Sequence, residues 1–169
     1  EHWAYWSRYI YINRYMDAPK PVYDDLLKLV RDKDYFVLTT NVDQQLFRVF
    51  PPQQICAFQG DFSYCQCSQP CRDNIWENRE LVKELTGCLA GVRLPEEAVP
   101  RCPDCGRVLV PWVRDDTFLE GTFWQDSLHR YHRFLRHWIM DQSDKKVLLL
   151  ELGVGEMTPS IIKLPFWEL

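Results

Sequence analysis

Apolar side chains recur at helical spacing in four parts of the chain. The clearest part runs from Tyr23 to Asp32, where large apolar residues stand three and four positions apart on one face. An aromatic-rich segment from Trp3 to Tyr15 fits either an amphipathic helix or a pair of strands, and we favour the helix. We predict two further helices, from Asn78 to Leu85 and from Phe123 to Trp138.

Two shorter segments have the continuous apolar pattern of strands that are covered on both faces. They run from Tyr35 to Thr40 and from Lys145 to Gly153. Each follows a predicted helix, and this repeated order indicates an α/β fold with a parallel sheet. Between the two halves, in residues 63–111, cysteine, proline and polar residues dominate, which indicates an inserted module.

The composition of the 169-residue chain is that of a globular protein, with 46% hydrophobic and 14% aromatic residues. A net charge of −4 argues against a nucleic-acid partner. Since no stretch has the pattern of a membrane helix or a secretory signal, we expect a soluble, cytoplasmic protein without a membrane partner. The odd number of cysteines, seven, does not indicate a disulfide framework, and Cys56 and Cys88 are expected to be small core residues.

The other five cysteines form two short clusters. The first contains Cys65, Cys67 and Cys71, and the second contains Cys102 and Cys105 in a CPxCG turn. Two short loops that each present two thiolates match a zinc ribbon, because a tetrahedral ion is held from two sides. The spacing between Cys67 and Cys71 is within the range usual for a pair of zinc ligands, so Cys65 is left out of the predicted set. We therefore predict a closed, structural zinc site of Cys67, Cys71, Cys102 and Cys105.

Polar residues follow the first predicted strand, and glycines follow the second. The residues after the first strand carry hydroxyl, amide and carboxylate groups: Thr39, Thr40, Asn41 and Asp43. Ligands of open α/β sheets bind beyond the carboxyl ends of the strands, and such groups suit a polyhydroxylated ligand such as a ribose. Gly153 and Gly155 would let the backbone approach the same ligand. Taken alone, each segment is typical of an ordinary turn or helix cap, so the order of the motifs is what indicates a site.

In this order the motifs resemble those of the sirtuin family. TTNVD is similar to the family's TQNxD, FQG stands where the family has a His-Gly pair, and LGVG is similar to its GTS turn before a proline. The two cysteine pairs match its zinc ribbon. The resemblance covers nearly the whole chain and is greatest to the macrodomain-linked class M sirtuins, which share motifs similar to QGD, QCSQPC, RDDTF and LGVG…TPSIIKLPFW.

The resemblance implies an α/β fold in which a partial sirtuin-type, Rossmann-like parallel sheet carries the inserted four-cysteine zinc-ribbon module. Residues 1–62 and 112–169 would form the incomplete NAD-binding domain, and residues 63–111 the zinc-binding module. Asn41 would orient the nicotinamide ribose and the incoming nucleophile, and Asp43 would help to hold NAD. The resemblance also implies four further residues lining the cofactor site: Thr40, Gly153, Val154 and Gly155.

Gln59 stands where deacetylating sirtuins have the histidine that acts as general base on a ribose hydroxyl. A glutamine amide does not titrate near neutral pH, but it can hold a ribose by hydrogen bonds while nicotinamide departs. With Asn41 and Asp43, Gln59 completes the predicted catalytic set. The substitution favours ADP-ribosylation over deacetylation, and RDDTF departs from the hydrophobic pattern of an acetyl-lysine tunnel.

The class M resemblance implies a mono-ADP-ribosyltransferase that modifies a lipoyl-carrier protein resembling the glycine cleavage H protein, with a macrodomain partner that removes the mark. The alternatives are an NAD-dependent deacylase and a catalytically silent, truncated sirtuin-like module. The chain has no counterpart of the family's Gly-rich loop, whose backbone N–H groups bind the NAD phosphates. We therefore expect a fragment of a longer protein or a truncated copy, in which pyrophosphate binding would be impaired.

Overall fold

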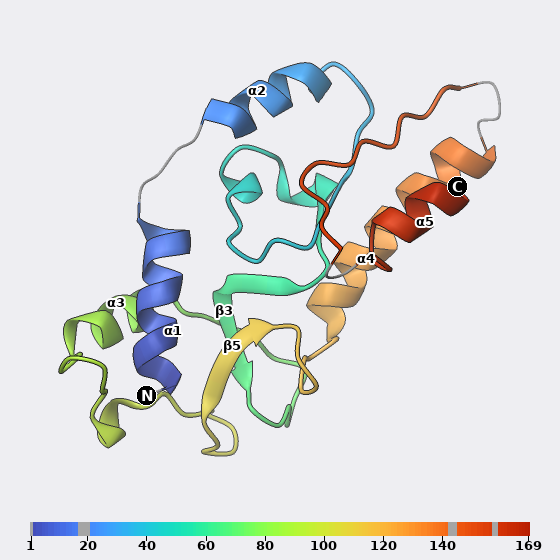
Figure 1. Ribbon diagram of the computed structural model, residues 1–169. Coiled ribbons are helices and arrows are strands. Elements are labelled where there is room, and N and C mark those ends of the chain that lie inside the picture. The colour runs from blue at the N-terminus through green and yellow to red at the C-terminus, as the bar shows by residue number, and fades with distance from the viewer. Residues whose placement is uncertain (1, 17–20, 142–144, 157–158) are drawn as a thin grey trace.

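The computed structural model describes residues 2–16, 21–141, 145–156 and 159–169 (Figure 1). Its α-helices are α1 (His2–Ile10), α2 (Pro21–Val30), α3 (Arg79–Gly87), α4 (Thr122–Leu135) and α5 (Lys163–Glu168). Two π-helical turns continue α1 and α4: η1 (Tyr11–Tyr15) and η5 (Arg136–Asp141). Its strands are β1 (Val37–Thr39), β2 (Ile55–Ala57), β3 (Gly60–Cys67), β4 (Trp76–Glu77) and β5 (Leu109–Val113). All four predicted helices are confirmed.

A two-stranded parallel sheet confirms the predicted α/β class. Strand β1 pairs with β2, with Val37 opposite Ile55 and Thr39 opposite Ala57. The expected second strand, Lys145–Gly153, was wrong: residues 146–152 are irregular, and Leu148 is 83% exposed. An apolar segment forms a strand only where a neighbouring strand accepts and donates its backbone hydrogen bonds. Within the described residues, no strand pairs with this segment.

A three-stranded antiparallel sheet with the order β4-β3-β5 lies within residues 60–113, which include the segment predicted as an inserted module. The central strand, β3, begins at Gly60 opposite Val113 and ends at Cys67 opposite Leu109. One strand therefore connects the turn that carries Gln59 to the first predicted zinc ligand. This sheet was not predicted, because its central strand is buried on both faces and yet consists largely of polar residues and cysteines, which do not form an apolar run.

Helix α1 packs against α3 and the antiparallel sheet (Figure 1). Its buried residues, Trp3, Ala4, Ser7 and Ile10, recur at three- and four-residue spacing and so share one face. The indole N–H of Trp3 donates to the carbonyl oxygen of Leu109 at 2.6 Å, which ties α1 to β5. The buried face of the N-terminal aromatic segment is thus part of the core beside this sheet.

Helix α4 begins against the loop that follows Cys71. The backbone N–H of Thr122 donates to both carboxylate oxygens of Asp73, at 3.1 and 3.0 Å, and the Thr122 hydroxyl donates to the same carboxylate. Asp73 therefore caps the N-terminus of α4 from a distant part of the chain. A Cβ atom at Gly121 would overlap this carboxylate, so a larger residue there would displace the Asp73 side chain.

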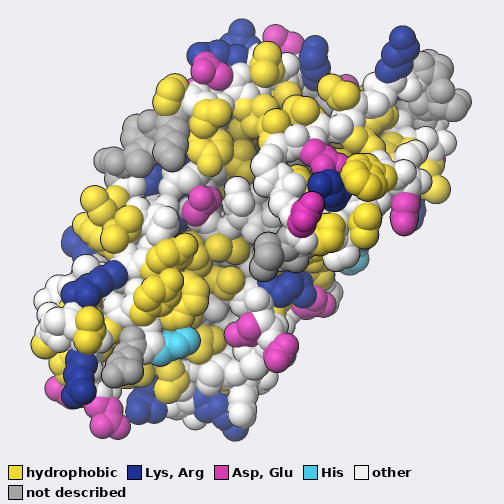
Figure 2. All heavy atoms as spheres, viewed as in Figure 1, with side chains coloured by type: hydrophobic (Ala, Val, Ile, Leu, Met, Phe, Trp, Pro, Cys, Tyr) yellow, Lys and Arg dark blue, Asp and Glu magenta, His cyan; other side chains and the backbone are white. Residues whose placement is uncertain are grey.

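Hydrophobic side chains gather over α1 and over the part of the surface where α2 and residues 145–152 lie (Figure 2). On α1 they include Tyr5, which is 58% exposed and stacks on Tyr9 with ring centroids 5.4 Å apart. Among the described residues, every helix is too short or too polar to cross a membrane.

Candidate functional site

The predicted catalytic residues Asn41 and Gln59 each stand two positions beyond the end of a strand in the parallel pair. Thr39 is opposite Ala57, and the backbone N–H of Phe58 donates to the carbonyl oxygen of Thr39 at 2.9 Å, which extends the pairing by one residue. Asn41 is exposed and Gln59 is half-buried. Because the strands are parallel, both residues lie at the carboxyl edge of the sheet, where α/β proteins bind ligands.

The loop from Thr40 to Gln45 is held by local hydrogen bonds. The N–H of Asn41 donates to the Thr39 hydroxyl at 3.1 Å, and the N–H of Gln45 donates to the Asp43 carboxylate at 3.2 Å. The second bond closes an Asx turn around Gln44, whose φ is 58°. The half-buried Thr40 and Asp43 flank the exposed Asn41 amide, so hydroxyl, amide and carboxylate groups are all present at this edge.

Gln59 lies in a tight turn that only glycine can complete. Gly60 has φ 95°, and a Cβ atom there would overlap the carbonyl oxygen of Trp112 on β5. The carbonyl oxygen of Gln59 accepts the backbone N–H of Arg114 at 3.0 Å. The backbone of the turn is therefore fixed from both sides, while the Gln59 side chain has no hydrogen bond within the described residues.

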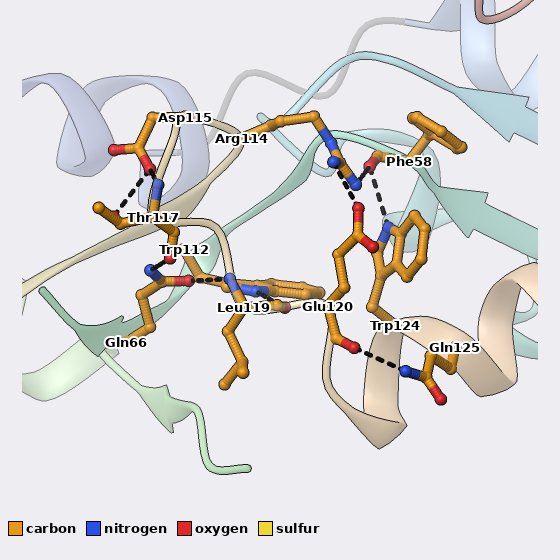
Figure 3. A network of polar contacts seen from close by, with 10 residues as sticks. All are labelled: Phe58, Gln66, Trp112, Arg114, Asp115, Thr117, Leu119, Glu120, Trp124 and Gln125. Atoms are coloured by element: carbon orange, nitrogen blue, oxygen red, sulfur yellow. Dashed lines mark hydrogen bonds and ion pairs between the residues drawn. The ribbon is translucent and has the colours of Figure 1, made fainter. Parts of the chain in front are cut away.

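Arg114 lies among aromatic rings beside this turn (Figure 3). Its guanidinium carbon is 4.4 Å from the ring centre of Phe118 and 5.0 Å from those of Phe58 and Trp124. Its Nη1 pairs with the Glu120 carboxylate at 2.6 Å. A guanidinium over aromatic faces is stabilised by cation–π attraction. The first residue of RDDTF thus supports the Gln59 turn with both its backbone and its side chain.

The carboxyl group of Asp61 is buried two residues beyond Gln59. It accepts the N–H of Ser63 at 2.6 Å, and the Ser63 hydroxyl in turn accepts a hydrogen bond from Arg14 at 2.6 Å. Burial raises the pKa of Asp61 to about 6. Arg14 lowers this pKa and Glu77 raises it, but both effects are smaller than that of burial.

The four predicted zinc ligands lie together. The Sγ atoms of Cys67, Cys71, Cys102 and Cys105 are all within 4.8 Å of one another. The Cys67–Cys105 separation is 3.5 Å and the Cys71–Cys102 separation is 3.7 Å. A tetrahedral zinc ion with Zn–S bonds of about 2.3 Å needs Sγ–Sγ separations of about 3.8 Å. All four are free thiols, so the cluster fits a zinc ion.

The remaining three cysteines lie outside this quartet. Cys65 is 1% exposed, packs in the core and lies outside the group of four cysteines that could hold a metal ion. Cys56 is fully buried, as expected. Cys88 is exposed, so its placement in the core was wrong; it directly follows the last residue of α3, where the chain leaves the packed helix face.

The predicted glycine turn lies in the irregular segment after residue 145. Gly153 and Gly155 are exposed, Val154 is half-buried, and Gly153 has φ 65°. No hydrogen bond joins these three residues to Asn41 or Gln59 in the described part of the chain. Their role in binding a cofactor stays a prediction.

Two features of the site were not predicted. Arg114 was noted only as part of a departure from a hydrophobic pattern, although aromatic residues on either side of it could have indicated cation–π contacts. Gln44 was missed, because a glutamine among polar residues gives no signal of burial. It is nevertheless 2% exposed, and its amide contacts the Gln59 turn through Gly60.

Comparison with known proteins gives two curated relatives. A "Protein ADP-ribosyltransferase" from Staphylococcus aureus strain Mu50 is 33% identical over 170 residues, covering 98% of this chain and 52% of that protein. A "Probable bifunctional ADP-ribose hydrolase/ADP-ribosyltransferase" from Fusarium oxysporum f. sp. cubense is 28% identical over 152 residues, covering 86% of this chain and 25% of that protein. The chain thus spans about half of the first relative and a quarter of the second.

Solved structures that match the chain include sirtuins. One, described as "The Structural basis of Sirtuin Substrate Affinity", has a TM-score of 0.43 and 20% identity, and covers 69% of this chain and 42% of that chain. Another, "Sir2 bound to acetylated peptide", has a TM-score of 0.41 and 19% identity, and covers 67% of this chain and 41% of that chain. No family model matches the sequence.

Proposed function

The chain is a relative of protein ADP-ribosyltransferases, consistent with a sirtuin-like family, and from this premise we propose that it transfers one ADP-ribose group from NAD to a protein. The observation that carries the proposal is the position of an amide, Gln59, at the same carboxyl edge as Asn41, each two residues beyond the end of one of the two parallel strands. In this proposal NAD is the substrate that supplies the group, and nicotinamide is released.

The chemistry of the amide favours transfer to a protein over deacylation. ADP-ribosyl transfer breaks the bond between ribose and nicotinamide and forms a bond from the same ribose carbon to the acceptor, whose proton is released. Asn41 and Gln59 would orient the ribose by hydrogen bonds, and Asp43 would help to hold NAD. Deacylation also requires a base that takes a proton from a ribose hydroxyl, and a glutamine amide cannot accept one near neutral pH.

The protein substrate in this proposal is a lipoyl-carrier protein resembling the glycine cleavage H protein. A macrodomain partner would remove the modification. The Fusarium relative supports a reversible mark, since its name pairs an ADP-ribose hydrolase with an ADP-ribosyltransferase. The thiol quartet would hold a structural zinc ion, because four protein ligands leave no open position for a reacting molecule.

The direct test is transfer of labelled ADP-ribose from NAD to a lipoylated carrier protein. We expect the Asn41→Ala variant to lose transfer and the Gln59→Ala variant to be strongly weakened. The matched control is Gln53→Ala, which makes the same change at an exposed glutamine and should keep the wild-type activity. Full activity of both site variants would reject the site assignment.

Two measurements separate the alternatives. Nicotinamide release that depends on an acyl-lysine peptide would identify a deacylase, whereas release that depends on the carrier protein supports the transferase. Calorimetric titration with NAD distinguishes both enzymes from a silent module. No heat at millimolar NAD would favour the silent module.

A further inference from the structure

Gln44 is the one residue other than glycine with a positive φ among the described residues, and it is 2% exposed. A left-handed backbone is unfavourable for a side chain with a Cβ atom, and burial of an amide is unfavourable unless the amide is hydrogen-bonded. The Gln44 amide is half satisfied: its Nε2 donates to the carbonyl oxygen of Gly60 at 3.0 Å, while its Oε1 is buried without a partner. An apolar side chain would fill the same space without burying an unpaired oxygen.

The bond from Gln44 joins the two segments that carry the proposed catalytic residues. Gln44 follows Asp43 directly, three residues after Asn41, and its acceptor Gly60 follows Gln59 directly. A second bond, from the N–H of Phe62 to the carbonyl oxygen of Val42 at 2.9 Å, joins the same two segments. Beyond the short parallel pair of strands, these bonds set the separation of the two segments.

The partners of Gln44 are themselves held in place. Gly60 lies close to β5, because a Cβ atom at this residue would overlap the carbonyl oxygen of Trp112. On the other side, the Asx turn from Asp43 to Gln45 encloses Gln44, and the Gln45 amide donates to the carbonyl oxygen of Asn13 on η1 at 2.6 Å. A change at Gln44 would therefore alter how the loop of Asn41 lies against the Gln59 turn, and with it the surroundings of both segments.

We propose that Gln44 is a positioning residue, which sets the distance between Asn41 and Gln59 through its hydrogen bond to Gly60. The inference rests on the proposed function for its catalytic consequence. Strained backbone conformations at buried positions persist where the surrounding structure holds them, and they cluster at functional sites. Gln44 itself does not need to touch NAD, because it acts through the two segments that it joins.

Two variants and one control test this role. Gln44→Met keeps the length of the side chain and removes the amide, while Gln44→Asn keeps an amide that is too short to reach Gly60. Gln53→Met makes the same chemical change at an exposed glutamine.

If the bond between Gln44 and Gly60 sets the geometry, both Gln44 variants should release nicotinamide from NAD with a kcat about 10- to 100-fold lower than that of the wild type, because small displacements of reacting groups lower the rate by about this factor. The KM for NAD should stay within about threefold of the wild-type value, and Gln53→Met should match the wild type.

Backbone amide resonances provide a readout that does not depend on activity. Substitution of Gln44 by Met should shift the amide signals of both Asn41 and Gln59, and Gln53→Met should shift neither. A normal kcat in both Gln44 variants, or shifts confined to one segment, would overturn the proposal. So would a normal kcat in Gln44→Asn alone, because the backbone conformation and not the bond would then be sufficient. A wild-type protein that releases no nicotinamide would refute the proposed function, and the amide shifts would still decide whether Gln44 joins the two segments.

Discussion

The backbone N–H of Arg114 donates to the carbonyl oxygen of Gln59 at 3.0 Å, so the end of β5 directly supports the turn at the candidate site. The same arginine places its guanidinium against the ring of Phe58, the residue before Gln59. The segments that precede and follow residues 63–111 in the sequence therefore meet at Gln59. The stability of this contact can be measured independently of any activity.

Replacement of Arg114 by lysine should lower the free energy of unfolding by about 1–2 kcal/mol. Lysine keeps the charge but loses the planar contact with Phe118 and Trp124 and the geometry of the ion pair with Glu120. Urea denaturation measures the change. Arg72→Lys is the control, because the Arg72 side chain is 70% exposed; equal losses in the two variants would contradict a special role for the aromatic contacts.

A Gly60→Ala substitution should destabilise the protein by at least about 3 kcal/mol. The new Cβ atom would overlap the carbonyl oxygen of Trp112, and φ of 95° would be strained for alanine. Thermal unfolding measures the effect. Gly91→Ala shares the positive φ but meets no atom within 4 Å, so it should cost only about 1 kcal/mol. Similar losses at both positions would show that backbone strain alone accounts for the effect.

The thiol quartet should bind one zinc ion per chain, measured by metal analysis of the purified protein. Cys102→Ser should abolish stoichiometric zinc and lower the melting temperature, because a closed site loses most of its affinity with one ligand. Cys88→Ser, at an exposed thiol outside the quartet, should retain zinc. Cys65→Ala should also retain it, and loss of zinc from that variant would mean that Cys65 belongs to the ligand set.

Asp61 should make the protein less stable as the pH rises. The pKa of its carboxyl group is raised from 3.8 to about 6 in the folded state, so between pH 4 and 6 the unfolded state loses its proton first. Stability is therefore lost across this range and stays lower above it. Asp61→Asn should be about 3 kcal/mol more stable than the wild type at pH 7.5 and equal to it near pH 4.

Urea denaturation at a series of pH values measures this difference, and subtraction of the wild-type curve removes the pH dependence that zinc binding contributes. The control is Asp34→Asn, at an exposed carboxyl group. A difference between Asp61→Asn and the wild type that does not change between pH 4 and 7.5 would show that burial does not raise this pKa.

The helices and the grouping of four cysteines could be predicted because their signals are local. Spacing of apolar residues marks the buried face of α1, and the gap between Cys67 and Cys71 indicates the pair that lies near Cys102 and Cys105. The parallel sheet was predicted, but with the wrong partner for β1. Strand pairing depends on contacts between distant segments, and the apolar run after Lys145 has the composition of a strand without the pairing.

The edge at which Asn41 lies could be inferred, because Asn41 follows an apolar segment that was predicted as a strand. Strand β2 was not predicted, and Gln59 was assigned to the site only through the family resemblance. The residues proposed to fix the separation of Asn41 and Gln59 could not be inferred from the sequence. Burial of Gln44 and the contacts of Arg114 depend on which side chains the fold brings beside them, and neither residue type is characteristic of a core. The structure reveals Gln44 by its positive φ and Arg114 by its aromatic neighbours.

The cap that Asp73 provides for α4 links the thiol quartet to a helix that is distant in the sequence, because Asp73 lies two residues after Cys71. A chelator or an oxidant that opens the quartet would free the loop and uncap the helix. Deuterium uptake in the first turn of α4 should then report the redox and metal status of sulfur atoms that belong to another part of the protein.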